Sequence, residues 1–128
     1  MEKRVHFLGF RSDIPELMTA CDLIAHTSIA PEPFGRVIVE AMFSGKPVVA
    51  SDAGGAVELI EHGKTGWLTP PGDVLKLAEI INRCRDRSEE ATAIAVAAKR
   101  EASQRFNLSL TNQKIAQLLD RVYQLHKN

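Results

Sequence analysis

The stretch Glu32-Pro-Phe-Gly-Arg-Val-Ile-Val-Glu40 decides how the rest of the sequence is read. Pro33 and Gly35 interrupt whatever precedes them, and a helical pattern begins at Arg36. The apolar residues that follow fall at helical spacing and form one stripe, which consists of Val37, Ile38, Ala41 and Met42. Gly45 is the usual kind of residue at which a helix ends. The sequence therefore predicts a helix that starts at Arg36 and ends at Gly45.

The start of this helix is a candidate site for an anionic ligand. Phe34 and Gly35 lie where backbone N–H groups have no acceptor within the helix, and such an end binds anions, phosphate above all. Glu32 comes just before it, and Glu40 follows about 7 Å further along the helix axis. This geometry suits a ligand with three parts: a sugar near Glu32, a diphosphate over the N-terminus and a ribose diol at Glu40. The alternative is that both glutamates are solvated residues.

The same string, with its flanks, resembles the E-x7-E signature of retaining glycosyltransferases that have the two-domain GT-B fold, the glycosyltransferase family 4 or group 1 type. The matching flanks follow in order, and they are Ala20-Cys21-Asp22-Leu23-Ile24, Glu40-Ala41-Met42, Gly45-Lys46-Pro47-Val48-Val49-Ala50-Ser51, Gly54-Gly55 with Glu58-Leu59-Ile60, and Gly63-Lys64-Thr65-Gly66-Trp67-Leu68. The resemblance runs from about Val5 to about Tyr123. It implies the C-terminal part of such an enzyme, which binds the nucleotide-sugar donor.

The resemblance also implies a reaction: transfer of a hexose, with retention, from a nucleoside-diphosphate sugar of the UDP, GDP or ADP type to an unidentified acceptor. Glu32 is then the catalytic candidate, in contact with the donor sugar, and Glu40 accepts hydrogen bonds from both ribose hydroxyls. The donor-binding candidates are Phe34, Gly35, Arg36, Ile38, Glu40, Gly54 and Gly55. No separate cofactor and no metal ion is implied.

Several candidates have a plain structural alternative. Ile38 and Val37 would either flank the nucleoside or pack in the core. Arg36 would reach a phosphate or an outer carboxylate, or it would lie in solvent. Gly54-Gly55 would allow close approach of the backbone before another helix, or it would form a tight turn. His26 at a strand end is a candidate acid–base group, but a packed histidine is favoured because the sequence offers no partner for it.

Composition and charge exclude other classes of protein. The chain of 128 residues fits one domain, and its 16 basic and 16 acidic residues give a net charge of zero. No basic run suggests nucleic-acid binding, and no apolar run approaches a membrane span. The first residues, Met1 to Arg4 and a few apolar ones, are too few for a signal peptide. Cys21 and Cys84 form no metal-binding pair and indicate reduced thiols in a cytoplasmic protein.

Strand and helix patterns alternate along the chain. Strands are expected at residues 5–8, 23–26, 47–50 and 66–69. Helices are expected at residues 13–21, 36–45, 56–60, 73–85 and 88–105 and from 109 onward, with Asp13 or Ser12, Asp73, Ser88 and Ser109 as caps. This order predicts an α/β fold: a Rossmann-like parallel sheet of about four strands with crossover helices and a C-terminal helical segment. Ligands should bind at the carboxyl ends of the strands, near residues 9–13, 27–35 and 51–56.

The domain is expected to span residues 1–128, truncated at its N-terminal side, with a helical tail over residues 73–127. By the resemblance, basic residues that neutralise the phosphates and the acceptor-binding domain belong to segments before Val5. The chain alone is therefore expected to be inactive and to need an acceptor-binding N-terminal domain or a partner subunit. The alternatives are a non-catalytic nucleotide or nucleotide-sugar binding module, or a remnant that only self-associates.

The missing segments also bear on assembly. The complete domain resembles a sheet of order 3-2-1-4-5-6, in which two absent strands would separate residues 5–8 from residues 23–26. Either these two strands pair directly, or residues 23–26 form an open edge. The last helix has an apolar stripe for docking, made of Ile115, Leu118, Leu119, Val122 and Leu125. A homodimer or a strand-exchanged oligomer is expected, and a monomer is the alternative.

Overall fold

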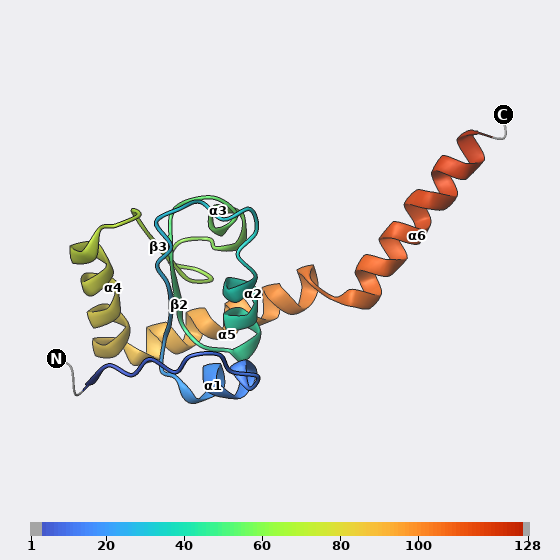
Figure 1. Ribbon diagram of the computed structural model, residues 1–128. Helices are drawn as coiled ribbons and strands as arrows, with labels where there is room; N and C mark the ends of the chain where they lie inside the picture. The colour runs from blue at the N-terminus through green and yellow to red at the C-terminus, as the bar shows by residue number, and fades with distance from the viewer. Residues whose placement is uncertain (1–3, 127–128) are drawn as a thin grey trace.

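The computed structural model describes residues 4–126, and its centre is a small parallel sheet (Figure 1). The strands β1 (Ile24–His26), β2 (Val48–Ser51) and β3 (Trp67–Thr69) are hydrogen-bonded in that order. The register places Ile24 opposite Val48 and Val49 opposite Trp67. The helices are α1 (Ile14–Ala20), α2 (Arg36–Ser44), α3 (Ala56–Leu59), α4 (Val74–Asp86), α5 (Ser88–Arg105) and α6 (Leu108–Leu125). The predicted α/β class, parallel and Rossmann-like, is confirmed.

One face of the sheet is covered by the two crossover helices α2 and α3. Each of these helices follows one strand and precedes the next, so right-handed connections put both on the same side. Val48 and Ala50 of β2 point into this layer and are almost completely buried there. They pack with Ile38 and Met42 of α2 and with Leu59 of α3. This cluster fixes α2, and with it the start of the predicted ligand-binding helix.

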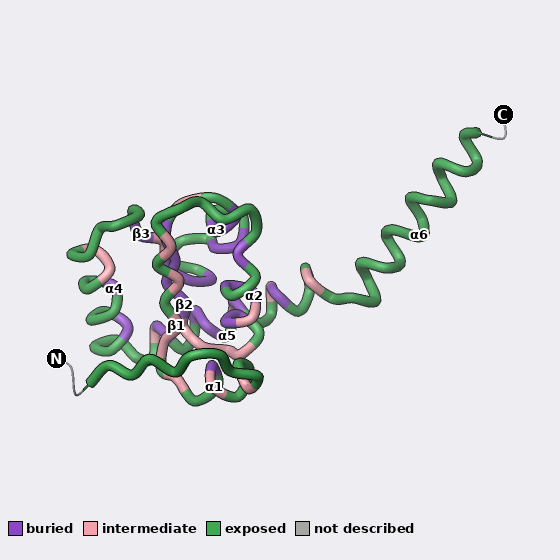
Figure 2. The backbone as a smooth tube through the Cα atoms, in the orientation of Figure 1, coloured by how far each residue is buried: buried purple, intermediate pink, exposed green. Residues whose placement is uncertain are grey.

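The other face of the sheet is covered by α4. The helix α5 contributes residues to the core clusters on both faces. Val49 of β2 and Trp67 of β3 pack with Ile80 of α4. Ala91 at the start of α5 belongs to this second cluster, while Ala98 further along belongs to the first. The small side chains of α5 let it pass close to both clusters. Figure 2 shows the resulting buried centre, with exposed backbone around it.

The sheet has three strands where the sequence predicted about four. Residues 5–8 form no strand, and the side chain of Phe7 is 97% exposed. An apolar run becomes a strand only beside a neighbour with unpaired backbone groups and under a covering layer. Among the described residues, residues 5–8 have no such neighbour and no covering layer. Residues 24–26, which form β1, are therefore the open edge of the sheet, and this is one of the two predicted alternatives. The residues of β1 are only half-buried or exposed.

Helix caps follow the sequence in part. Asp73 accepts a hydrogen bond from the Lys76 N–H at 2.9 Å and caps α4, as predicted. Asp13 stands at the N-cap of α1 without a capping hydrogen bond, because its carboxylate is paired with Arg11. Ser88 lies inside α5 rather than before it. Asn107, not Ser109, caps α6 by accepting from the Leu110 N–H, so the cap lies two residues earlier than predicted.

The last helix, α6, leaves the body of the molecule (Figure 1). No residue of α6 is buried, and its predicted apolar stripe faces solvent. Of the three C-terminal helices, α4 and α5 therefore contribute buried residues to the two core clusters, and α6 contributes none. Residue 127, the expected end of the helical tail, and residues 1–3 lie outside the described residues.

Candidate functional site

The candidate site is built on the carboxyl ends of the strands. His26 ends β1, Ser51 ends β2 and Thr69 ends β3. The loop of residues 27–35 leaves β1 and leads into α2, and residues 52–55 lead from β2 into α3. These two loops meet at the place where open parallel sheets bind ligands. Residues 9–13, also expected there, follow no strand because residues 5–8 form none.

Glu32 is held by a side chain from the sheet. The His26 Nε2 atom lies 3.2 Å from Glu32 Oε1, which is hydrogen-bonding distance. The His26 side chain is 14% exposed and that of Glu32 is 46% exposed. Both residues line a small depression of about 10 Å³, together with Gly35 and Ser51. That volume holds roughly one water molecule, so a sugar would meet Glu32 at the mouth of the depression and not inside it.

The Gly54-Gly55 pair packs against the backbone of the Glu32 loop. A Cβ atom on Gly54 would stand 2.3 Å from the carbonyl oxygen of Glu32, and one on Gly55 would stand 2.3 Å from that of Phe34. The Gly55 N–H also donates to the Glu32 carbonyl at 2.8 Å. Gly54 has φ +57°, a conformation that glycine adopts without strain. The two glycines thus provide the predicted close approach, and what they approach is the 32–34 loop.

The ring of Phe34 is engaged with the end of α5. It meets Phe106 edge to face, with ring centroids 5.9 Å apart and an interplanar angle of 84°. The Arg105 guanidinium lies over the Phe106 ring, 5.2 Å from the ring centroid, and it donates a hydrogen bond to the Glu58 carbonyl at 3.0 Å. The loop before α2 is therefore fixed to α5 by a side chain. Since the ring carries no N–H or O–H group, the backbone N–H is the donor that Phe34 can offer to a ligand.

The start of α2 has the geometry that an anion site needs. Gly35 is the N-cap and adopts φ +87°, and the first helical residues are Arg36 and Val37. The N–H groups of these residues have no carbonyl acceptor within the helix, so they are available to a ligand. Ile38 is fully buried and lies directly behind Gly35, where its Cδ1 would be 3.0 Å from a Cβ on that glycine. Ile38 thus belongs to the core, whereas Val37 is 40% exposed.

Glu40 lies on a different surface from Glu32. Its carboxylate oxygen Oε1 is 3.3 Å from Arg36 Nε, and the Arg36 side chain is 86% exposed. Both residues line a groove of about 430 Å³ between α1 and α2, to which Ile14 and Met18 contribute apolar walls. Such a groove suits a flat apolar group beside a polar one. Glu32 thus lies before the start of α2 and Glu40 lies within its first turns, but the two residues line separate cavities.

Two contacts of the site were not among the sequence-based predictions. The His26–Glu32 pair joins residues six apart across an irregular loop, so no periodicity predicts it; its only signal is a histidine at a strand end before a glutamate-bearing loop. The signal for the Arg36–Glu40 pair is its i, i+4 spacing, which favours ion pairs on a helix. The other candidates, Phe34, Gly35, Gly54 and Gly55, gather within the two loops at the strand ends.

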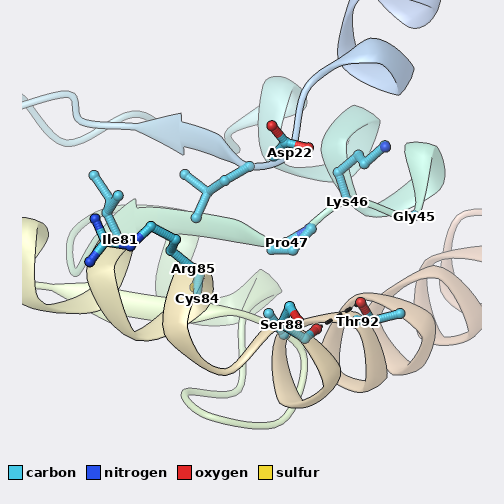
Figure 3. Close-up of a pocket in the computed structure, with 11 residues that line it drawn as sticks. Asp22, Gly45, Lys46, Pro47, Ile81, Cys84, Arg85, Ser88 and Thr92 are labelled. Atoms are coloured by element: carbon cyan, nitrogen blue, oxygen red, sulfur yellow. Dashed lines mark hydrogen bonds between the residues drawn. The ribbon is translucent and has the colours of Figure 1, made fainter.

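A separate cavity of about 530 Å³ opens at the amino ends of β1 and β2 (Figure 3). Leu23 and Pro47, which precede the two strands, line it, together with Lys46 and Arg85. Cys84 lies at its wall, where burial raises the pKa of the thiol. Cys21 and Cys84 are both free thiols. None of the candidate site residues lines this cavity.

Among residues 4–126, no cluster of three His, Cys, Asp or Glu side chains has the arrangement of a metal site. Within the same range, no helix combines the length and the apolar character that a bilayer crossing demands.

Comparison with known sequences points to one family. The family model described as "Glycosyl transferases group 1" matches residues 1–101. The amylovoran biosynthesis glycosyltransferase AmsK of Erwinia amylovora is 30% identical over 95% of this chain, which covers 32% of that protein. The spore coat protein SA of Bacillus subtilis is 35% identical over 90% of the chain, which covers 30% of that protein.

Solved structures of the C-terminal domains of GT-B glycosyltransferases have the same fold. Anabaena Alr3699/HepE in complex with UDP is 61% identical and superposes with a TM-score of 0.92, over 94% of this chain and 33% of that one. The same protein in complex with UDP-glucose gives a TM-score of 0.89. A glycosyltransferase from Rickettsia africae is 32% identical with a TM-score of 0.89, over 95% of this chain and 33% of that one. The chain thus spans about one third of the length of its relatives.

Proposed function

Since this chain belongs to the glycosyl transferases group 1 family, we propose that it binds the nucleotide half of a uridine-diphosphate hexose and presents the sugar for transfer with retention. The choice of uridine rests on the UDP and UDP-glucose complexes of the Anabaena protein, which is 61% identical to this chain. The observation that carries the proposal is the entry into α2, where Glu32, an N-terminal turn capped by Gly35 and Glu40 follow one another.

Each part of the donor has a proposed contact. The diphosphate lies over the N-terminus of α2, where backbone N–H groups and the helix dipole favour negative charge. Glu40, in the groove beside α1, accepts hydrogen bonds from the ribose hydroxyls. Glu32, in the loop before Gly35, contacts the sugar near the bond that breaks. No separate cofactor is part of this proposal.

The chemistry requires negative charge to be stabilised as the nucleoside diphosphate leaves. Preorganised N–H groups at a helix start provide such stabilisation without reorganisation. Arg36 stands at the same helix start and could leave Glu40 to meet a phosphate. Because the matched relatives are about three times as long as this chain, we propose that the remaining phosphate-binding residues and the acceptor site lie outside residues 1–128.

Calorimetric titration of the chain with UDP tests the donor site. Glu40→Gln should weaken UDP binding about tenfold, since hydrogen bonds to a charged group contribute about 1.5–3 kcal/mol. Glu79→Gln is the matched control, because it removes a carboxylate from another helical ion pair, with Lys76 on α4, away from the site. Equal UDP affinities for the wild type and Glu40→Gln would refute the ribose contact. GDP and ADP in parallel titrations would show whether uridine is preferred.

A second proposal concerns activity: the chain by itself is a nucleotide-sugar binding module that does not transfer the sugar. Its support is the share of the relatives' length that it spans, about one third. An assay with UDP-hexoses and a panel of lipid and sugar acceptors should detect no transfer. Transfer at ordinary enzyme rates that Glu32→Ala abolishes would contradict this second proposal and support the first.

A further inference from the structure

The contact between His26 and Glu32 joins the end of β1 to the loop that precedes α2. His26 is the last residue of β1 and its side chain is mostly buried, whereas Glu32 belongs to the irregular stretch before α2. The His26 Nε2 and Glu32 Oε1 atoms are 3.2 Å apart, and within residues 4–126 this is the only hydrogen bond described for the Glu32 side chain. A glutamate side chain without such a partner rotates freely about its bonds. The contact therefore limits where the carboxylate can point.

The second ring nitrogen of His26 determines which tautomer is present. The Nδ1 atom is buried, and no group in the described part of the chain pairs with it. A hydrogen bond to a carboxylate needs a proton on Nε2. A further proton on Nδ1 would leave a buried N–H of a charged ring without an acceptor, which costs more than an unpaired lone pair. The geometry therefore favours the tautomer with its proton on Nε2, which donates to Glu32.

The backbone of the loop is fixed from the opposite side. Gly55 donates to the Glu32 carbonyl, and Gly54 lies against the same peptide. With the main chain fixed by the glycines and Oε1 fixed by His26, the orientation of the whole Glu32 residue is determined. The other carboxylate oxygen, Oε2, is left to accept from a ligand hydroxyl.

We propose that His26 is a positioning residue, which holds the Glu32 carboxylate through its Nε2–H so that the other oxygen faces the donor sugar. This inference rests on the proposed function, because it assumes that Glu32 contacts the sugar. His26 does not touch the donor. Its removal therefore lowers the contribution of the sugar to binding and leaves the contribution of the nucleotide unchanged.

The test compares two ligands and two substitutions. The ratio of the UDP-glucose affinity to the UDP affinity, measured by calorimetry, isolates the sugar contact. His26→Leu should lower this ratio three- to tenfold and leave the UDP affinity within twofold of the wild type. His26→Gln, whose amide N–H can reach the same carboxylate, should restore most of the ratio. His6→Gln, an exposed histidine outside the site, should change nothing.

A double substitution separates positioning from a general structural effect. Glu32→Gln alone should lower the ratio as His26→Leu does, and the two substitutions together should lower it no further. An unchanged ratio in His26→Leu, beside a lowered ratio in Glu32→Gln, would overturn the proposal, because Glu32 would then work without His26. Equal losses in His26→Leu and His26→Gln would overturn it as well.

The tautomer provides a measurement that needs no ligand. Long-range ¹H–¹⁵N NMR spectra of the ring should show the proton of His26 on Nε2, with a shift that changes in Glu32→Gln. A proton on Nδ1 would overturn the proposal, and so would ring chemical shifts that are the same in the wild type and in Glu32→Gln. Failure of the wild type to bind either ligand would refute the proposed function instead, and the NMR spectra would still decide whether His26 holds Glu32.

Discussion

Gly54 lies against Glu32 so closely that a Cβ atom on residue 54 would stand 2.3 Å from the Glu32 carbonyl oxygen and 2.8 Å from its backbone nitrogen. The loop that carries the candidate catalytic glutamate is thus shaped by a residue 22 positions later in the chain, in the turn that follows β2. Because both contacts are with backbone atoms, no side-chain rotation could relieve the overlap.

Gly54→Ala should therefore destabilise the fold and displace Glu32. Two costs add: an alanine at φ +57° costs about 1–2 kcal/mol, and the overlap forces the 32–34 loop to move. Gly63→Ala is the matched control, since Gly63 has φ +76° but no atom within 4 Å of its would-be Cβ. Urea denaturation should show a larger loss of unfolding free energy for Gly54→Ala than for Gly63→Ala. Equal losses would mean that the loop tolerates the added methyl group.

Arg36 is expected to act on the phosphates rather than on the nucleoside. In the structure it is paired with Glu40, and it stands at the first position of α2, where a diphosphate would lie. Arg36→Ala should weaken UDP binding about three- to tenfold and reduce its salt dependence. Uridine, which has no phosphate, should bind the variant at least as well as the wild type, because Glu40 is released. NMR titration with both ligands measures this, and a parallel loss of uridine binding would contradict it.

The pair of Arg83 and Glu90, which joins α4 to α5, predicts a pH dependence of stability. Arg83 Nη2 donates to Glu90 Oε1 at 2.5 Å, and this hydrogen bond holds the pKa of Glu90 below its ordinary value of 4.5. A carboxylate with a lowered folded-state pKa contributes stability above the unfolded-state pKa and loses it as the pH falls through the folded-state pKa. The contribution should therefore be constant near neutral pH and disappear in acid.

Glu90→Gln should remove that acid-dependent contribution. The difference in unfolding free energy between wild type and variant should be steady near neutral pH and shrink as the pH falls below the ordinary glutamate pKa of 4.5. Glu89→Gln is the control, because it removes a neighbouring carboxylate from the same first turn of α5. Denaturation at a series of pH values measures both variants. The same acid profile in the two variants would assign the effect to the helix start and not to Arg83.

The sequence predicted those features that depend on local pattern. The α2 helix, its glycine boundaries and the buried strand β2 follow from spacing and composition, and they appear as expected. The apolar residues 5–8 were misassigned because a strand depends on a neighbour, which local pattern does not reveal. The same limit applies to the site. The contact of His26 with Glu32 and the packing of Gly54 on that loop depend on how two loops meet, and loop conformation has no periodicity.

The apolar stripe of α6 also predicts association of this chain. Its members are 44–70% exposed, and none is covered by another element among the described residues; they are Ile115, Leu118, Leu119, Val122 and Leu125. Burial of about 400–600 Å² of apolar surface between two such helices would contribute on the order of 10–15 kcal/mol. Association itself costs about 4–15 kcal/mol. A micromolar dimer needs a net free energy of about −8 kcal/mol. This burial supplies it when the cost of association is near the lower end of its range, so we expect a dimer that forms at micromolar concentration and dissociates on dilution.

Light scattering across a gel-filtration peak tests this association. The wild type should show the mass of two chains or more at micromolar concentration. Leu118→Lys should give one chain, because it places a charge within the stripe, whereas Gln117→Lys, on the opposite side of α6, should behave as the wild type. Circular dichroism should show the same folded body in all three, since α6 contributes no buried residue. A wild type with the mass of one chain at every concentration, and without binding of a dye to apolar surface, would rule the dimer out.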